Sequence, residues 1–111
     1  MTPTTIKIGE TDITFSDTIT KDGTGFDASG CDVAFWLRNV LGGTSFSGSG
    51  AVTGGSGSGV TFTADADFAA FLTSAGKYYQ EWSITTSDMV PLTFSFPEDG
   101  YNQIRVLDKL A

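Results

Sequence analysis

The sequence of 111 residues contains no histidine and a single cysteine. Without histidine, the chain cannot build a Ser-His-Asp triad, a Cys-His dyad or a histidine metal site. Without a second cysteine, it cannot form an intramolecular disulfide. We therefore expect a protein that is not an enzyme, with no catalytic residue, no metal site, no cofactor and no small-molecule substrate.

Basic residues are also scarce. Six Lys and Arg stand against 13 Asp and Glu, which gives a formal net charge of −7. The basic residues are spaced singly along the sequence: Lys7, Lys21, Arg38, Lys77, Arg105 and Lys109. Since nucleic-acid affinity comes mainly from clustered Lys and Arg, we expect no nucleic-acid partner.

Long hydrophobic runs are missing. The first residues, MTPTTIKIGETD, have neither the basic region nor the apolar run of a secretory signal. No window approaches the ~18 consecutive apolar residues of a membrane span, so we expect no membrane partner. At this length, residues 1–111 form a single domain that is made and folded in a cytoplasm.

What the sequence does contain is a repeated alternation of apolar and polar residues, the period of a half-buried β-strand. Six segments show it: residues 4–8, 11–20, 31–40, 78–85, 90–96 and 103–107. In the segment 78–85, one face is shared by Tyr78, Gln80, Trp82 and Ile84, and Tyr78 is predicted to lie in the core. Residues 1–10 are also a candidate for an N-terminal arm. Turn signals, of which Asp22-Gly23 is the strongest, separate the segments. Seven or eight short strands with turns every eight to twelve residues predict an antiparallel β-sandwich.

The clearest strand is CDVAFWLRNV, residues 31–40. Its Val33, Phe35 and Leu37 share one face and are predicted to point inward, with Cys31 as a small buried hydrophobe. Alternation then places Trp36 and Arg38 outward. Such an outward tryptophan is either covered by a neighbouring segment of the chain or offered to a partner.

Residues 42–59, GGTSFSGSGAVTGGSGSG, hold eight of the chain's 14 glycines. As a linker, this stretch would leave two pieces that are each too small for a stable core. Phe46 and Val52 lie an even number of residues apart and would face the same side of an extended strand. We therefore predict a Gly/Ser-rich hairpin with a mobile tip at residues 54–59, which tolerates shortening.

Residues 64–76 break the alternation and predict a short helix that crosses between two sheets. Asp65 or Asp67 can cap its start, and Phe68, Phe71 and Leu72 share one face. The two aspartates could also supply calcium oxygens, but the remaining ligands of a calcium loop are absent from the sequence.

The adjacent carboxylates of Glu98 and Asp99 indicate a solvated turn rather than a catalytic pair.

Several of these segments resemble immunoglobulin-like domains of tailed-phage virion proteins, in particular the N-terminal domain of phage baseplate upper proteins. The similarity runs through residues 15–20, Asp22-Gly23 and VAFWL, then GSGAVT and GVTF, where the register differs from the family pattern by one residue. It continues in TSAGKYYQEWSIT, similar to the family's aG-x-Y-x-x-E strand. Its most specific piece is FPEDGYNQIRVLDKL, similar to the ending fP-x-dGy-x-x-i-x-V.

Gly76-x-Tyr78 also resembles the tyrosine corner of immunoglobulin domains, with Gln80 where those domains have a cysteine. The resemblance implies an immunoglobulin-like antiparallel β-sandwich without a disulfide. It implies no catalytic residues.

By this resemblance, we expect a virion structural protein of a bacteriophage, made in the host cytoplasm. It would act in several copies, as a homo-oligomer with other virion proteins, in a head, neck, tail or baseplate. The alternative is a surface-decorating module that recognises host carbohydrate or the cell surface. For either role, the candidate interface residues are Trp36, Arg38, Tyr79 and Tyr101.

Overall fold

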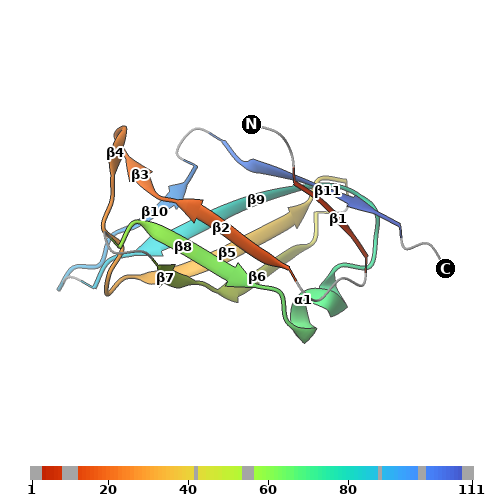
Figure 1. The fold of residues 1–111 in the computed structure, drawn as a ribbon, viewed down its shortest axis with the longest axis horizontal. Coiled ribbons are helices and arrows are strands. Elements are labelled where there is room, and N and C mark those ends of the chain that lie inside the picture. Colours follow the sequence, from red (N-terminus) through yellow and green to blue (C-terminus); the bar gives the residue numbers. More distant parts are fainter. Residues whose placement is uncertain are drawn as a thin grey trace.

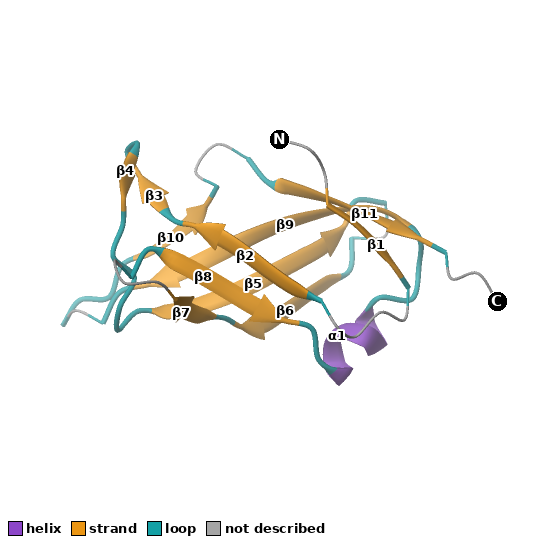
Figure 2. Cartoon of the chain, in the orientation of Figure 1, coloured by secondary structure: helices purple, strands orange, loops and turns teal. Residues whose placement is uncertain are grey.

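A computed structural model describes residues 4–8, 13–41, 43–53, 57–87, 89–97 and 100–108. Most of these residues lie in strands, and one short helix interrupts them (Figure 2). The all-β prediction is therefore confirmed. No helix in the described ranges is long and apolar enough to cross a membrane.

A six-stranded sheet, here called the large sheet, forms one layer. Its order is β1-β11-β9-β5-β6, and β10 pairs with the second half of β9. All its pairings are antiparallel except that of β1 with β11. The strands are β1 (Thr4–Lys7), β5 (Asp32–Asn39), β6 (Ser45–Ser49), β9 (Gly76–Thr85), β10 (Thr93–Phe96) and β11 (Asn102–Leu107).

A three-stranded antiparallel sheet, here called the small sheet, has the order β2-β8-β7 and passes in front of β9 and β5 in Figure 1. Its strands are β2 (Thr14–Thr18), β7 (Ala51–Thr53) and β8 (Gly59–Thr63). A two-stranded hairpin, β3 (Thr20–Lys21) and β4 (Thr24–Gly25), projects at one end. Its turn is the expected Asp22-Gly23, and both residues have positive φ.

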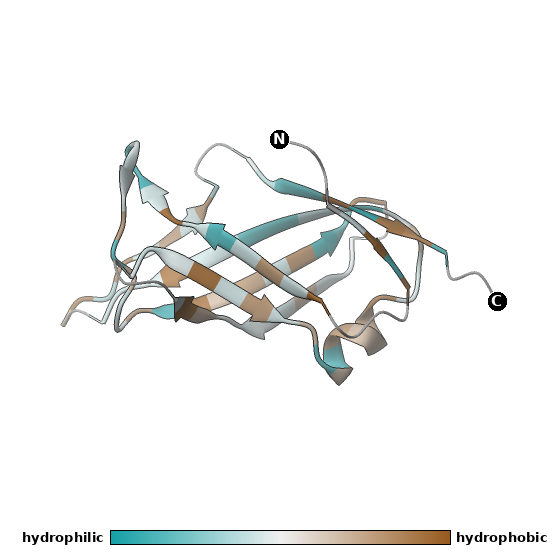
Figure 3. Cartoon of the chain, in the orientation of Figure 1, coloured by the Kyte–Doolittle hydropathy of each residue, from teal (hydrophilic) through white to brown (hydrophobic). Residues whose placement is uncertain are grey.

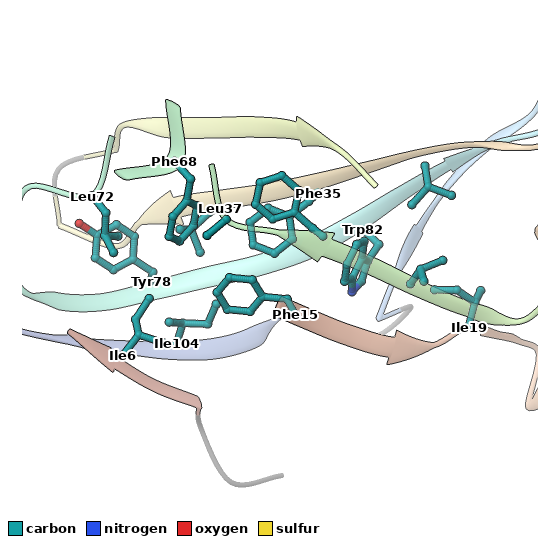
Figure 4. Packing of buried hydrophobic residues seen from close by; sticks show 14 of the residues in the cluster. Ile6, Phe15, Ile19, Phe35, Leu37, Phe68, Leu72, Tyr78, Trp82 and Ile104 are labelled. Atoms are coloured by element: carbon teal, nitrogen blue, oxygen red, sulfur yellow. The ribbon is translucent and has the colours of Figure 1, made fainter. Parts of the chain in front are cut away.

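The core lies between the two sheets. Phe35 of the large sheet stacks on Phe62 of the small sheet, with ring centroids 4.4 Å apart. Phe15, Phe68 and Trp82 pack around this pair (Figure 4). The inward faces predicted for residues 31–40 and 78–85 are confirmed, because alternate residues are buried from Val33 to Leu37 in β5 and from Tyr78 to Ile84 in β9. Cys31 is only partly buried at the edge of the core.

Helix α1 (Ala66–Phe71) connects the small sheet to the large one. The prediction of this crossover is confirmed, and Asp65 is its N-cap, accepting a hydrogen bond from the backbone N–H of Phe68 at 2.9 Å. Phe68 and Leu72 are buried, whereas Phe71 is half-buried. The helix is thus held by one cap and one apolar face.

The segment of residues 44–53 is not one strand, as its alternation suggested. β6 pairs with β5 in the large sheet, whereas β7 pairs with β8 in the small sheet. Gly50 lies at the point of transfer, where an added Cβ would come within 2.8 Å of the Val33 side chain. A residue with a side chain would separate the sheets here, so the glycine permits the change of sheet.

The predicted loose tip of the Gly/Ser stretch is wrong for its described part. Gly57 is buried, and its carbonyl accepts a hydrogen bond from Ala28 at 2.8 Å. The Ser58 carbonyl accepts another from Ile19 at 2.7 Å. A deletion that includes these residues would remove both bonds, so shortening is not neutral. Residues 54–56 lie outside the described ranges.

The N-terminal segment is also more than an arm where it is described. β1 pairs in parallel with β11, and Ile6 is buried in the core. Two strands, β11 and β9, separate β1 from β5. The described part of the N-terminal segment therefore does not cover Trp36.

Candidate interaction surface

The four predicted interface residues come together on the outer face of the large sheet. Trp36 and Arg38 project from β5, Tyr79 projects from β9, and Tyr101 directly precedes β11. All four line one hollow of about 150 Å³, together with Leu37, Ser45 and Glu81. We call the set Trp36, Arg38, Tyr79 and Tyr101 the aromatic patch.

Strand register explains why the patch forms. Arg38 pairs with Tyr79, and Trp36 pairs with Glu81. Tyr79 also pairs with Gln103 on its other side. Side chains opposite one another on the same face of a sheet approach within about 5 Å, so the pairing of three strands assembles the patch.

The rings and the guanidinium contact one another. Tyr79 and Tyr101 are stacked with centroids 5.1 Å apart and planes 14° apart. The Arg38 Cζ lies 5.9 Å from the centroid of the Tyr101 ring, within cation–π range. These contacts hold the patch in one arrangement before any partner binds, which lowers the entropic cost of binding.

The patch remains accessible. Trp36 is 40% exposed and Tyr101 is 49% exposed. Tryptophan, tyrosine and arginine are the residues most enriched in interface hot spots. Trp36 was expected to be either covered by a neighbouring segment or available to a partner. In the described part of the chain it is accessible, which favours the second alternative.

Sequence reasoning identified these four residues but missed their neighbours Glu81, Lys77 and Arg105. The signal was present: in KYYQEW, residues 77, 79 and 81 alternate with the inward residues 78, 80 and 82. Once Tyr78 and Trp82 are placed inward, Lys77 and Glu81 must accompany Tyr79 on the outer face.

Other candidate groups lie elsewhere. Asp65 caps α1, and no group of three or more metal-ligating side chains occurs in the described part of the chain. Glu98 and Asp99 fall outside the described ranges. Asp27 accepts hydrogen bonds from the backbone and side chain of Ser29, which lower the pKa of its carboxyl.

No protein-family model matches this sequence, and no curated protein matches it either. The functional argument therefore starts from the arrangement of the aromatic patch.

Proposed function

We propose that this chain is an immunoglobulin-like β-sandwich. The small sheet order β2-β8-β7 corresponds to strands B, E and D of that fold. The order β11-β9-β5-β6 in the large sheet corresponds to G, F, C and C′, as in the variable type. The loop that connects the sheets before β9 holds α1, at the corner between strands E and F.

Tyr78 provides independent support for this assignment. Its hydroxyl donates a hydrogen bond to the Ser74 carbonyl at 2.8 Å, four residues upstream. A tyrosine near the start of strand F that bonds back to the preceding backbone is the hallmark called the tyrosine corner. Tyr78 stands near the start of β9, in the corresponding place.

For function, we propose a non-enzymatic structural component of a tailed-phage virion, present in several copies and bound to its partners through the aromatic patch. The observation that carries the interaction role is the convergence of Trp36, Arg38, Tyr79 and Tyr101 on one accessible hollow. The virion assignment is supported in addition by a resemblance to phage baseplate domains, which is carried by FPEDGYNQIRVLDKL and the neighbouring motifs. Truncation of a hot-spot residue costs about 2 kcal/mol or more of association free energy, about a thirtyfold change.

The test is incorporation into particles. Virions are purified on a density gradient and assayed for this chain by mass spectrometry, after complementation with wild-type protein or with Trp36→Ala. We expect the wild type to co-sediment with particles in a fixed copy number and the variant to be depleted. Ser47→Ala, an exposed change opposite Trp36 on β6, is the matched control. A wild-type chain absent from particles would overturn the proposal.

The same patch supports a second candidate, recognition of carbohydrate. A pair of stacked tyrosines and an exposed tryptophan beside Glu81 present apolar rings next to a carboxylate. Sugars stack on such rings and bond to such polar groups. A glycan array separates the candidates: binding that Tyr101→Ala abolishes, without incorporation into particles, would favour the carbohydrate role.

A further inference from the structure

The outer face of the large sheet gathers basic residues that are far apart in the sequence. Lys77 pairs with Arg105 across β9 and β11, and both are exposed. Arg38 lies on the same face, opposite Tyr79, which is two residues further along β9 than Lys77. We call Arg38, Lys77 and Arg105 the cationic cluster. Lys7, the last residue of β1, lies at its margin opposite Leu107.

Few acidic groups accompany this cluster. Glu81 lines the hollow of the aromatic patch, and Asp108 lines a second hollow of about 460 Å³ with Lys77 and Arg105. Within the described residues, none of the three cluster members forms an ion pair. The whole chain has a formal net charge of −7. A positively charged face is therefore a local reversal of the overall charge.

Acidic groups gather at the opposite end of the sandwich. The segment from β3 to the start of β5 contains Asp22, Asp27 and Asp32, with Lys21 as its one described cation. Asp32 begins β5 and Arg38 lies near its end, so about 20 Å of strand separates the two charges. The side chain and backbone of Ser29 donate hydrogen bonds to Asp27 and lower the pKa of its carboxyl.

A molecule 48 Å long and 25 Å wide thus has a basic surface near one end and an acidic surface near the other. In Figure 1 the part of β9 and β11 that carries the cationic cluster lies toward the right, whereas the β3–β4 hairpin and the start of β5 lie toward the left. Complementary charges attract across an interface and set its orientation.

We propose that copies of this chain associate head to tail, with the cationic cluster and aromatic patch of one copy bound to the segment of residues 22–32 of the next. This inference rests on the proposed function, and it identifies the partner of the aromatic patch as a second copy of the chain. Such a heterologous contact closes into a ring when its rotation allows, and otherwise extends into a filament. Either form places many copies in a virion component.

The test uses two variants that each lose one side of the contact. Lys77→Glu/Arg105→Glu reverses the cationic cluster. Asp22→Asn/Asp27→Asn/Asp32→Asn neutralises the acidic end, and asparagine retains the turn-forming chemistry at the first two positions. Asp67→Lys, an exposed change on α1 outside both surfaces, is the charge control. Circular dichroism checks that each variant folds, and Arg105→Gln replaces the double variant if that variant does not.

Sedimentation velocity then reports the mass at rising protein concentration. We expect wild type and Asp67→Lys to assemble at 50 mM salt, with a dissociation constant at least tenfold weaker at 500 mM because salt screens the charges. Each of the two variants alone should be monomeric. Their equimolar mixture should form a dimer and nothing larger, because the cluster variant keeps only its acidic end and the acidic-end variant keeps only its cluster.

Three results would overturn the inference: a wild type that is monomeric at every concentration, a mixture that stays monomeric, or assembly that salt does not weaken. Binding of a 20-base-pair DNA duplex by a monomeric wild type would do so as well and would assign the cluster to nucleic acid. A monomer that still enters particles through Trp36 would leave the proposed function intact.

Discussion

The two faces of β5 and β9 are built by alternate residues of the same strands, yet their chemistry differs. The inner face carries Phe35, Tyr78 and Trp82, each at most 2% exposed. The outer face carries Trp36, Arg38 and Tyr79, which line an open hollow. Both faces are rich in aromatic rings. The position of a ring relative to the small sheet, rather than its residue type, separates the buried rings from the exposed ones.

The hydropathy of the strands shows the same division (Figure 3), with hydrophobic bands that alternate with bands of intermediate hydropathy along β8. On the inner face the rings contact one another at centroid distances of 4.4–6.4 Å, so each removed ring leaves a cavity. On the outer face a removed ring leaves only solvent. The comparison therefore predicts that substitutions of adjacent residues on opposite faces differ widely in their effect on the free energy of unfolding.

The largest effect is expected for Phe35→Ala. This side chain is fully buried and contacts Phe15, Phe62, Phe68 and Trp82. Truncation should lower the free energy of unfolding by about 3–5 kcal/mol through loss of burial and cavity formation. Urea denaturation followed by circular dichroism measures it. A variant as stable as the wild type would contradict the central place assigned to this ring.

A smaller loss in the free energy of unfolding is expected for Gly57→Ala. This substitution extends the comparison to the Gly/Ser stretch of residues 42–59. A Cβ at Gly57 would lie within 2.3 Å of Ser29 Oγ and closer still to Asp27, and its φ is +71°. The added methyl and the left-handed backbone should together cost about 2–4 kcal/mol. Thermal unfolding measures the loss.

Gly43→Ala is the matched control, because Gly43 has a φ of +70° but nothing within 4 Å of its Cβ position. It should incur only the backbone term, about 1–2 kcal/mol. Equal losses at the two glycines would mean that the packing of Gly57 against residues 27–29 contributes nothing.

The third effect compares two neighbouring tyrosines. Tyr78→Phe removes the hydrogen bond to the Ser74 carbonyl and should cost about 0.5–1.5 kcal/mol. Tyr79→Phe removes a hydroxyl on the outer face and should leave the free energy of unfolding unchanged. Paired urea titrations measure both. A larger loss of stability for Tyr79→Phe than for Tyr78→Phe would mean that Tyr78 is not the tyrosine of the corner.

Strand alternation is local, and this explains what the sequence could predict. It placed Phe35, Trp36 and Tyr78 on the correct faces because a side chain's face depends only on its own strand. The N-cap at Asp65 was predictable for the same reason, since its hydrogen bond spans three residues.

What escaped prediction depends on distant partners. Gln80 was placed inward, but its hydrogen bond from Asn102, which also donates to Asp17, joins three segments of the chain. The change of sheet at Gly50 depends on Val33 and Trp82, and the burial of Gly57 depends on the loop of residues 27–29. The cationic cluster likewise appears only after β9 and β11 pair.

Among the substitutions that remove a whole ring, the smallest effect on folding is expected for Trp36→Ala, one residue from the largest. Trp36 is 40% exposed and faces away from the small sheet, so no cavity forms when its ring is removed. Substitutions at such surface positions change the free energy of unfolding by about 0.5 kcal/mol or less. The urea titration used for Phe35→Ala should therefore give the wild-type midpoint and slope, while association falls at least tenfold. A loss near that of Phe35→Ala would mean that the ring is covered by the chain itself, which would remove the aromatic patch from the recognition surface and end the contrast between the two faces.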